Sequence, residues 1–358
     1  MNRDVITKRI RAIRRELNKK KIKCLIVTKP ANVTYTTGFM GEDSWAAITK
    51  GGVYLLTDNR YIEQAQGECP NCTILERSDS MSELVANLVK KLKSVRTITV
   101  EKTTSLADFE ALKKQVKARF RSVADVIEPV RSNKDNTEIK TIEAAAAIAT
   151  RALKQTLPHI KPGITESELA GMLDFQIRKL GATNSFPTIV AFGPNASRPH
   201  HQPSQRKLKR KDTILIDFGA KYKGYCSDIT RCFAVGGPTA FYKKVFDVVE
   251  QAQAAAIKMI KAGVKMKRVD AAAREVIDKS DLPVYRHGTG HGFGLEIHES
   301  PFLKLKSRGT LKAGQVITIE PGVYMPGKLG VRIEDDVLVT ETGHRILTRK
   351  CPHSLLLS

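Results

Sequence analysis

The chain has 358 residues, of which 41% are hydrophobic and 27% are charged, and its formal net charge is +23. This composition excludes a disordered or fibrous protein, and the length predicts two domains. Because no apolar run approaches the roughly 18 residues of a membrane span, and none resembles a signal peptide, we expect a soluble, unexported protein without a membrane partner.

Lysine and arginine are spread over the whole chain and are densest at residues 8–23 and 206–211. Few aromatic residues lie among them to stack on bases, which favours a solvated basic surface over a nucleic-acid site, with non-specific attraction of polyanions as a side effect.

The six cysteines form no disulfide framework for a chain of this length, which predicts a cytoplasmic protein. The C-x-x-C spacing of Cys69 and Cys72 has no second pair, which favours a structural role over a metal or redox site.

The first third of the chain alternates helix and strand patterns. Isoleucines and a leucine recur at helical spacing from Ile6 to Leu17, and they predict a basic first helix that ends near Lys21. Further strands are predicted at 24–28, 46–48 and 53–57, and further helices at 81–92 and 106–118. A small α/β domain over residues 1–131 follows, and a polar, turn-prone stretch at 131–136 separates it from the rest.

The remaining chain, residues 136–358, starts with an alanine-rich helix at 137–160 and contains a faint repeat. Segments 160–164 and 260–264 have similar sequences, and each follows a long helix and leads into a second one. Thr165 and Glu168 form a capping box at the start of one such helix. Two helices followed by strands in each copy predict an α+β domain with two-fold pseudo-symmetry.

Two pairs of acidic residues lie beside predicted turns. Asp217 and Asp228 belong to strand patterns that flank the turn 221–224, and a hairpin centred on Tyr222 and Lys223 would place them face to face. Like charges in that position destabilise a pair of strands unless a proton, a basic side chain or a metal ion compensates.

The second copy repeats this arrangement, because Glu320 and Glu334 straddle a turn at 326–327. A single acid beside a turn usually faces solvent, but four that converge predict two divalent cations. His287, His291 and His298 share a glycine-rich segment, and the glycines beside His291 would let the backbone approach an ion. An imidazole with four carboxylates suits manganese, cobalt, iron or zinc better than calcium.

Five short segments together resemble the pita-bread metallopeptidases, and most closely their Xaa-Pro aminopeptidase and prolidase branch. They are D-F-G at 217–219, S-D-I-T-R at 227–231, H-G-T-G-H-G at 287–292, I-E-P-G at 319–322 and V-R-I-E-D at 331–335. Segments 32–39 and 56–61 resemble the creatinase-type N-terminal domain. The resemblance implies that a creatinase-type α/β domain over 1–131 precedes a pita-bread catalytic domain over 136–358.

The resemblance also implies a ligand set for two metal ions, manganese first, with cobalt, zinc or iron as alternatives. Asp217 would bind one ion, His291 and Glu320 the other, and Asp228 and Glu334 both. A metal-bridging hydroxide would attack the peptide bond, and Glu320 would carry a proton to the leaving nitrogen.

Further roles follow from the same resemblance. His200 and His298 would be catalytic, with His200 steadying the tetrahedral intermediate. His287 and Arg332 would hold the substrate, and alternation along 331–337 places Arg332 and Glu334 on one face. We expect His201 to face solvent. Three residues that flank Asp228 would support it: Tyr225, Thr230 and Arg231.

These features predict an aminopeptidase that removes the first residue from peptides with proline at the second position. The alternatives are an Xaa-Pro dipeptidase (prolidase) and, outside enzymes, a peptide- or polyanion-binding protein on the same fold. Methionine aminopeptidase would not need the first domain, and creatinase lacks the metal ligands. Relatives with this first domain commonly pair through it, which implies a homodimer.

Overall fold

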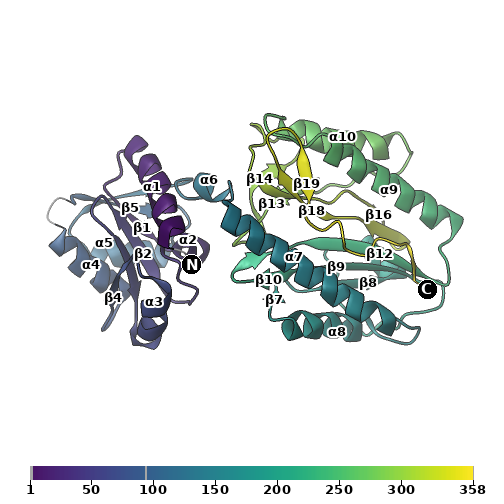
Figure 1. The fold of residues 1–358 in the computed structure, drawn as a ribbon, viewed down its shortest axis with the longest axis horizontal. Coiled ribbons are helices and arrows are strands. Elements are labelled where there is room, and N and C mark those ends of the chain that lie inside the picture. The colour runs from purple at the N-terminus through teal and green to yellow at the C-terminus, as the bar shows by residue number, and fades with distance from the viewer. Residues whose placement is uncertain (1–2, 93–94, 358) are drawn as a thin grey trace. The chain divides into compact units, whose positions relative to one another are not determined.

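The computed structural model describes residues 3–92 and 95–357, and the chain divides into two compact units, Met1–Arg131 and Ser132–Ser358 (Figure 1). Each unit has a hydrophobic core of its own. Among the described residues, no helix has both the length and the apolar character that crossing a membrane requires.

The first unit is built on one mixed sheet with the strand order β4-β3-β2-β1-β5-β6. Strand β2 is antiparallel to both of its neighbours, whereas β5 is parallel to β1 and to β6. The strands are β1 (Cys24–Val27), β2 (Trp45–Thr49), β3 (Val53–Thr57), β4 (Thr73–Glu76), β5 (Thr97–Glu101) and β6 (Arg119–Val123). The helices are α1 (Arg3–Lys19), α2 (Pro30–Thr37), α3 (Ile62–Glu68), α4 (Met81–Lys91), α5 (Leu106–Gln115) and α6 (Glu128–Arg131).

The predicted helices and strands of this unit are confirmed to within a few residues. Helix α1 buries the apolar stripe from Ile6 to Leu17 and leaves basic residues such as Lys8 and Arg15 exposed. Cys69 is buried and Cys72 is partly buried, and both cysteines are free thiols.

The second unit consists of two halves, each with two helices followed by strands, as the repeat predicts. The helices are α7 (Asn136–Thr156), α8 (Glu166–Lys179), α9 (Ala240–Lys258) and α10 (Met266–Asp278). The strands of the first half are β7 (Thr183–Asn184), β8 (Ile189–Phe192), β9 (Thr213–Phe218), β10 (Ala220–Tyr222), β11 (Tyr225–Cys226) and β12 (Ile229–Val235). Those of the second are β13 (Gly290–Gly292), β14 (Glu299–Leu303), β15 (Val316–Ile319), β16 (Gly322–Met325), β17 (Leu329–Arg332), β18 (Asp335–Val339) and β19 (His344–Ile346), and β20 (Leu356–Leu357) returns to β12.

Equivalent hydrogen bonds in the two halves support the repeat. The amide of Gly163 donates to the carbonyl of Leu208 at 2.8 Å, and the amide of Gly263 donates to that of Leu311 at 2.9 Å. Both glycines have positive φ angles, 101° and 85°, which other residues rarely adopt. The capping box of Thr165 is present at the start of α8.

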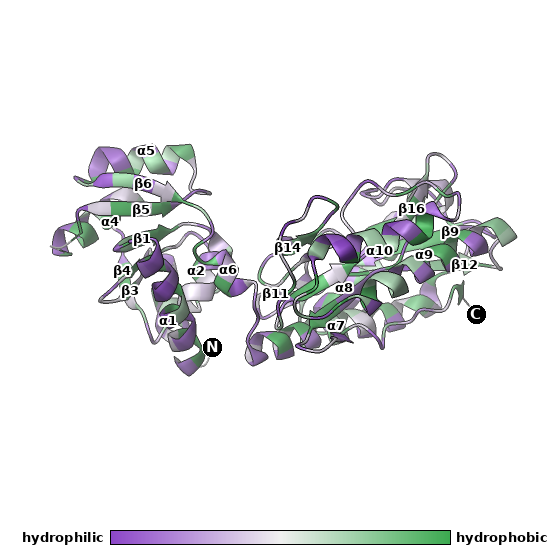
Figure 2. Ribbon diagram, turned by 90° about the horizontal axis from the view of Figure 1, so that it is seen from above, coloured by the Kyte–Doolittle hydropathy of each residue, from purple (hydrophilic) through white to green (hydrophobic). Residues whose placement is uncertain are grey.

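The strands of the second unit lie between two helical pairs (Figure 1). Helices α7 and α8 pack on β8, β9 and β12, and α9 and α10 pack on β15, β17 and β18. Central strands such as β1, β5, β9 and β12 are mainly hydrophobic (Figure 2). The two halves meet through an antiparallel bridge between Thr230 and Glu334.

Candidate metal centre and active site

A cavity of about 560 Å³ lies in the second unit, and residues of both halves line it. Its lining includes every residue for which the sequence predicts a metal-binding, catalytic or substrate-binding role: Asp217, Asp228, His291, Glu320, Glu334, His200, His298, His287 and Arg332. The fold therefore brings together side chains from positions as far apart in the sequence as His200 and Glu334.

The candidate metal ligands with carboxylate side chains lie at or near the points where the regular strand pairing ends. Asp217 is near the end of β9, but Asp228, Glu320 and Glu334 each lie in a gap between two short strands. The backbone amides of these three residues donate to partners outside a regular strand ladder. The amide of Asp228 donates to Asp336 Oδ2 at 3.2 Å. The amide of Glu320 donates to the Thr289 carbonyl at 2.8 Å, and that of Glu334 donates to the Thr230 carbonyl at 3.2 Å. Such breaks free the side chains to turn towards a common centre.

The prediction that Asp217 directly faces Asp228 is wrong. Asp217 pairs with Thr230, because the turn is centred on Lys223 and Gly224 rather than on Tyr222 and Lys223. Both turn residues have positive φ angles, 47° and 82°, as the favoured two-residue hairpin turn requires. The shift keeps the alternation of the strand, so Asp228 lies diagonally from Asp217 and on the same face.

In the second hairpin the two acids flank the turn, as the sequence predicts, and the strand pairing fixes their register. Pairs on both sides of the gap, Gly322 with Arg332 and Ile319 with Asp335, place Glu320 opposite Glu334. The two halves therefore hold their acid pairs by similar but not identical geometry, one diagonal and one direct.

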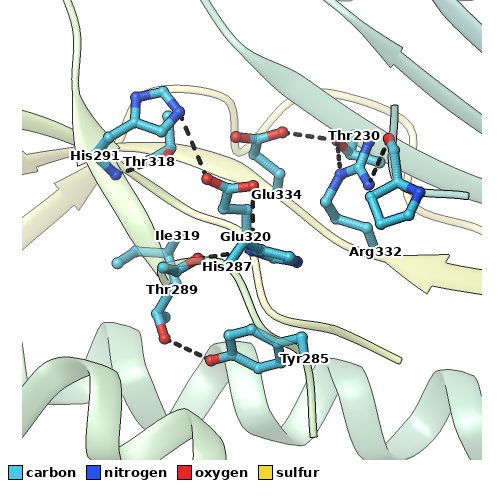
Figure 3. A network of polar contacts seen from close by, with 12 residues as sticks. Thr230, Tyr285, His287, Thr289, His291, Thr318, Ile319, Glu320, Arg332 and Glu334 are labelled. Atoms are coloured by element: carbon cyan, nitrogen blue, oxygen red, sulfur yellow. Dashed lines mark hydrogen bonds and ion pairs between the residues drawn. The ribbon is translucent and has the colours of Figure 1, made fainter. Parts of the chain in front are cut away.

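The imidazole of His291 faces the carboxylates. Its Nε2 lies 3.5 Å from Glu320 Oε1 (Figure 3). The same atom lies 3.6 Å from Asp228 Oδ2. One ligand atom each from Asp228, His291 and Glu334 lie within 4.8 Å of one another. On its other side, Nδ1 of His291 lies 3.1 Å from the carbonyl of Gly292, which only accepts. Nδ1 therefore carries the proton and Nε2 keeps its lone pair, the tautomer that binds a metal ion.

Burial perturbs the titration of these groups. Burial and the neighbouring carboxylates raise the pKa values of Asp228 and Glu334 well above their usual range. Burial raises the pKa of Glu320 to about 8 and lowers that of His291 to about 3. Carboxylates held this close are ionised together only when a cation compensates their charge, and the neutral imidazole completes a donor set suited to transition-metal ions.

The positive charge of Arg332 pairs with the carboxylate of Asp217. Its Nη2 lies 2.6 Å from Asp217 Oδ2, and both side chains are largely buried. The other oxygen, Asp217 Oδ1, is buried and has no hydrogen-bond partner among the described residues. A buried carboxylate oxygen without a donor is costly, and a cation would satisfy it. The residues present therefore fit a metal centre.

The glycines beside His291 let their own backbone lie close to neighbouring backbone. A Cβ atom on Gly290 would lie 1.9 Å from the carbonyl oxygen of Thr318, and one on Gly292 would lie 2.5 Å from that of Ser300. These glycines let β13 pack closely against neighbouring backbone, and this packing places His291 in the cavity.

A tyrosine that the sequence analysis did not single out links the two predicted substrate-binding residues. Arg332 donates to the Tyr324 hydroxyl at 2.8 Å, and His287 Nε2 lies 3.1 Å from the same oxygen. Burial lowers the pKa of His287 to about 4, so its imidazole is neutral near pH 7. Its Nδ1 donates to the Gly288 carbonyl at 2.8 Å, so Nε2 accepts from Tyr324.

The adjacent histidines of segment 199–203 (P-H-H-Q-P) both line the cavity but differ in exposure. His200 is exposed and lines the cavity, as does His298, whose ring lies 4.4 Å from that of His291. The prediction that His201 faces solvent is wrong. His201 is only 6% exposed, because its Nε2 bonds to the buried carboxylate of Glu166 at 2.8 Å.

The three residues that flank Asp228 differ in what they contact. Thr230 donates to Glu334 Oε2 at 2.6 Å and accepts from Arg332 at 3.0 Å (Figure 3). Arg231 donates to the backbone carbonyl of Glu334 at 2.6 Å. Tyr225 instead directs its hydroxyl to Glu138 of α7, 3.1 Å away, and does not line the cavity.

Comparison with known families matches both units. Residues 140–341 match the metallopeptidase family M24, and residues 9–133 match the creatinase/prolidase N-terminal domain.

Three similar proteins have names that mention the Xaa-Pro bond. The chain is 33% identical to an Xaa-Pro dipeptidase of Pyrococcus horikoshii, over 97% of this chain and 98% of that one. A solved structure of an Xaa-Pro dipeptidase from Bacillus anthracis superposes with a TM-score of 0.94 at 36% identity, over 98% and 99% of the two chains. An X-Pro aminopeptidase from Thermotoga maritima superposes with a TM-score of 0.89 at 36% identity, over 96% and 99%.

Proposed function

This chain belongs to metallopeptidase family M24, with a creatinase/prolidase N-terminal domain, and we propose that it is a two-metal peptidase that hydrolyses Xaa-Pro dipeptides. The observation that carries the metal-dependent chemistry is the buried group of Asp228, His291 and Glu334, with its neutral, correctly protonated imidazole. The similar proteins named for the Xaa-Pro bond support the substrate class. Two of these three similar proteins are named as dipeptidases, and this favours dipeptides as the substrate over the longer peptides that the sequence motifs led us to expect.

We assign five side chains to the two ions: Asp217, Asp228, His291, Glu320 and Glu334. Bound there, divalent ions would lower the pKa of a water molecule and polarise the scissile carbonyl. Manganese is the first ion to test, because a site of four carboxylates and one imidazole favours first-row ions with oxygen ligands.

The remaining residues of the cavity bind and orient the peptide. Glu320 would pass a proton to the proline nitrogen as it leaves, since that nitrogen has no hydrogen of its own. His200 and His298 would donate hydrogen bonds to the oxygen on which negative charge develops. Arg332 would hold Asp217 in place, and His287 would fix the hydroxyl of Tyr324. A set of apolar side chains offers a surface for the proline ring: Phe186, Pro187, Ile189, Ile297 and Phe302.

Lys304 supports the dipeptidase assignment. Among the described residues that line the cavity it is the only lysine, and its ammonium lies 5.1 Å from the centre of the Phe302 ring, with no carboxylate paired to it in the described part of the chain. Arg332 is already bound to Asp217 and Tyr324. The Lys304 ammonium is therefore the cation available for the free carboxylate of a dipeptide, which an internal proline of a longer peptide lacks at that position.

The substrate preference is tested by comparing hydrolysis of Ala-Pro and Ala-Pro-Ala by the manganese-loaded protein. We expect kcat/KM to be higher for Ala-Pro. A higher value for Ala-Pro-Ala would instead support the aminopeptidase, and Ala-Ala serves as the control without proline.

Three further expectations stay predictions: a homodimer, a cytoplasmic location and attraction of polyanions by the +23 charge. Gel filtration tests the first and localisation of the tagged full chain tests the second. Salt-dependent retention on heparin tests the third, since attraction by charge weakens as salt screens it.

A further inference from the structure

A second buried carboxylate lies outside the metal centre, at the start of α8. Glu166 is fully buried and accepts five hydrogen bonds from residues 192–204. Its Oε1 accepts from the amide of Phe192 at 2.7 Å and the side chain of Asn195 at 2.8 Å. Its Oε2 accepts from His201 at 2.8 Å and from the amide and hydroxyl of Ser204 at 3.0 and 2.5 Å.

These bonds close a loop around His200. Oε1 holds the chain where β8 ends, and Oε2 holds it just after His200. From residue 198 to the start of β9 at Thr213 the chain forms no named strand or helix. Backbone hydrogen bonds to residues 163–167 hold its later part, residues 204–208, so the Glu166 side chain is the contact that ties down the part nearest His200. On the cavity side, Arg332 donates to the carbonyl of Pro199 at 3.4 Å. His200 is thus exposed, whereas its neighbour His201, which also lines the cavity, is buried against Glu166.

The charge state of Glu166 strengthens this anchor. Burial alone would raise the pKa of Glu166, but hydrogen bonds from Ser204 and His201 outweigh it, and the pKa is lowered. An ionised carboxylate only accepts hydrogen bonds, so Nε2 of His201 must carry a hydrogen. Hydrogen bonds to a buried charge are stronger than neutral ones and costly to break, so the loop has one well-defined anchored position.

We propose that Glu166 and His201 are positioning residues that set where the His200 imidazole stands over the cavity. The carboxylate fixes His201, the backbone from His201 to Pro199 transmits that position, and His200 then meets the developing charge of the reacting carbonyl. Glu166 does not line the cavity, and His201 lines it without being one of the five proposed metal ligands, so their effect should fall on turnover and not on metal binding. The inference rests on the role proposed above for His200.

The test uses His201→Phe, which keeps a ring but removes the hydrogen bond, and His201→Gln, whose amide nitrogen reaches about as far as Nε2. With Ala-Pro and manganese, we expect His201→Phe to lower kcat on the order of 10- to 100-fold while the number of bound ions and their Kd stay unchanged. His201→Gln should restore most of the loss. His353→Phe is the matched control, because His353 makes the same 2.8 Å contact with Glu250 on the surface, and it should leave kcat unchanged.

A double-mutant cycle separates positioning from a general effect on the fold. In a His200→Ala protein, adding His201→Phe should cause no further loss of kcat, because the group being positioned is gone. An equal loss with and without His200, or a weaker Kd for manganese in His201→Phe, would overturn the inference while leaving the peptidase intact. If His200→Ala alone hydrolyses Ala-Pro at the normal rate, the role proposed for His200 itself fails.

If His201→Phe does not fold, the pair His201→Gln and His201→Asn carries the test. The asparagine amide is too short to reach Glu166 as Nε2 does, so kcat should be higher for glutamine than for asparagine. Equal kcat values for the two variants would count against positioning by this contact.

Discussion

Replacing Asp228 by asparagine should raise the stability of the metal-free protein. It should also weaken manganese binding, so that the metal stabilises the variant less than the wild type. Asparagine keeps the size of the side chain but removes one negative charge from a buried group. The ligand atoms of Asp228 and Glu334 lie within 4.8 Å of each other. Two unit charges at that separation repel by about 3.5 kcal/mol when the effective dielectric constant is about 20.

The measurable gain is smaller than this repulsion, because the wild-type carboxylates can take up a proton and so relieve part of it. Their raised pKa values have this cause. We expect Asp228→Asn to raise the free energy of unfolding of the metal-free protein by about 1–3 kcal/mol, or Tm by roughly 2–6 °C. Manganese at 100 times its Kd should stabilise the wild type by about 2.7 kcal/mol. The variant should lose this gain, since a missing charged ligand weakens Kd on the order of 100-fold or more.

The assay is thermal unfolding with and without manganese, together with calorimetric titration of the metal-stripped protein. Asp247→Asn is the control, because Asp247 pairs with Lys243 on the surface and should change neither quantity by much. A metal-free Asp228→Asn protein that is less stable than the wild type, or one that binds manganese normally, would refute the assignment of this cluster as a metal centre.

Three further predictions follow from the same structure. Lys304→Gln should raise KM for Ala-Pro but not for Ala-Pro-amide, which lacks the carboxylate; equal effects on both would count against Lys304 as its partner. Gly290→Ala should lower the free energy of unfolding by about 3 kcal/mol or more because its Cβ would clash with Thr318, whereas Gly171→Ala, in an open helical position, should raise it by about 0.5–1 kcal/mol, as denaturant titration would show. Glu166→Gln should be less stable than the wild type near pH 7. Since the folded pKa of Glu166 is lowered, that difference should narrow as pH falls from about 4.5 through the folded value; a gap that widens in acid would contradict it.

Much of the site could be predicted because its signals are local in the sequence. Four acids beside turns and a histidine among glycines are visible without a structure, and the repeat shows that two halves contribute. Helix starts were also readable, since the capping box of Thr165 and Glu168 spans only three residues.

The wrong predictions, for Asp217 and His201, and the two missed residues, Tyr324 and Lys304, depend on backbone conformation and contacts that the sequence pattern does not specify. Asp217 pairs with Thr230 instead of the predicted Asp228 because Lys223, which is not a glycine, adopts a positive φ angle at the turn. His201 is buried because its partner Glu166 lies 35 residues earlier in the chain. Tyr324 and Lys304 reach the cavity from strands and loops whose side-chain direction depends on the finished fold. For His201 the deciding partner is distant in sequence, whereas for Asp217 the deciding turn is close in sequence and only its backbone conformation differs from the prediction.

The central claim is that the carboxylates and His291 hold two metal ions that enable hydrolysis of the Xaa-Pro bond. The most direct test is to titrate manganese into metal-stripped protein while measuring bound ions and Ala-Pro hydrolysis on the same samples. We predict no hydrolysis without metal and a rise in activity that saturates at about two ions per chain. Full activity in the metal-stripped protein, or no cleavage of Ala-Pro or Ala-Pro-Ala with manganese, cobalt or zinc bound, would contradict the account.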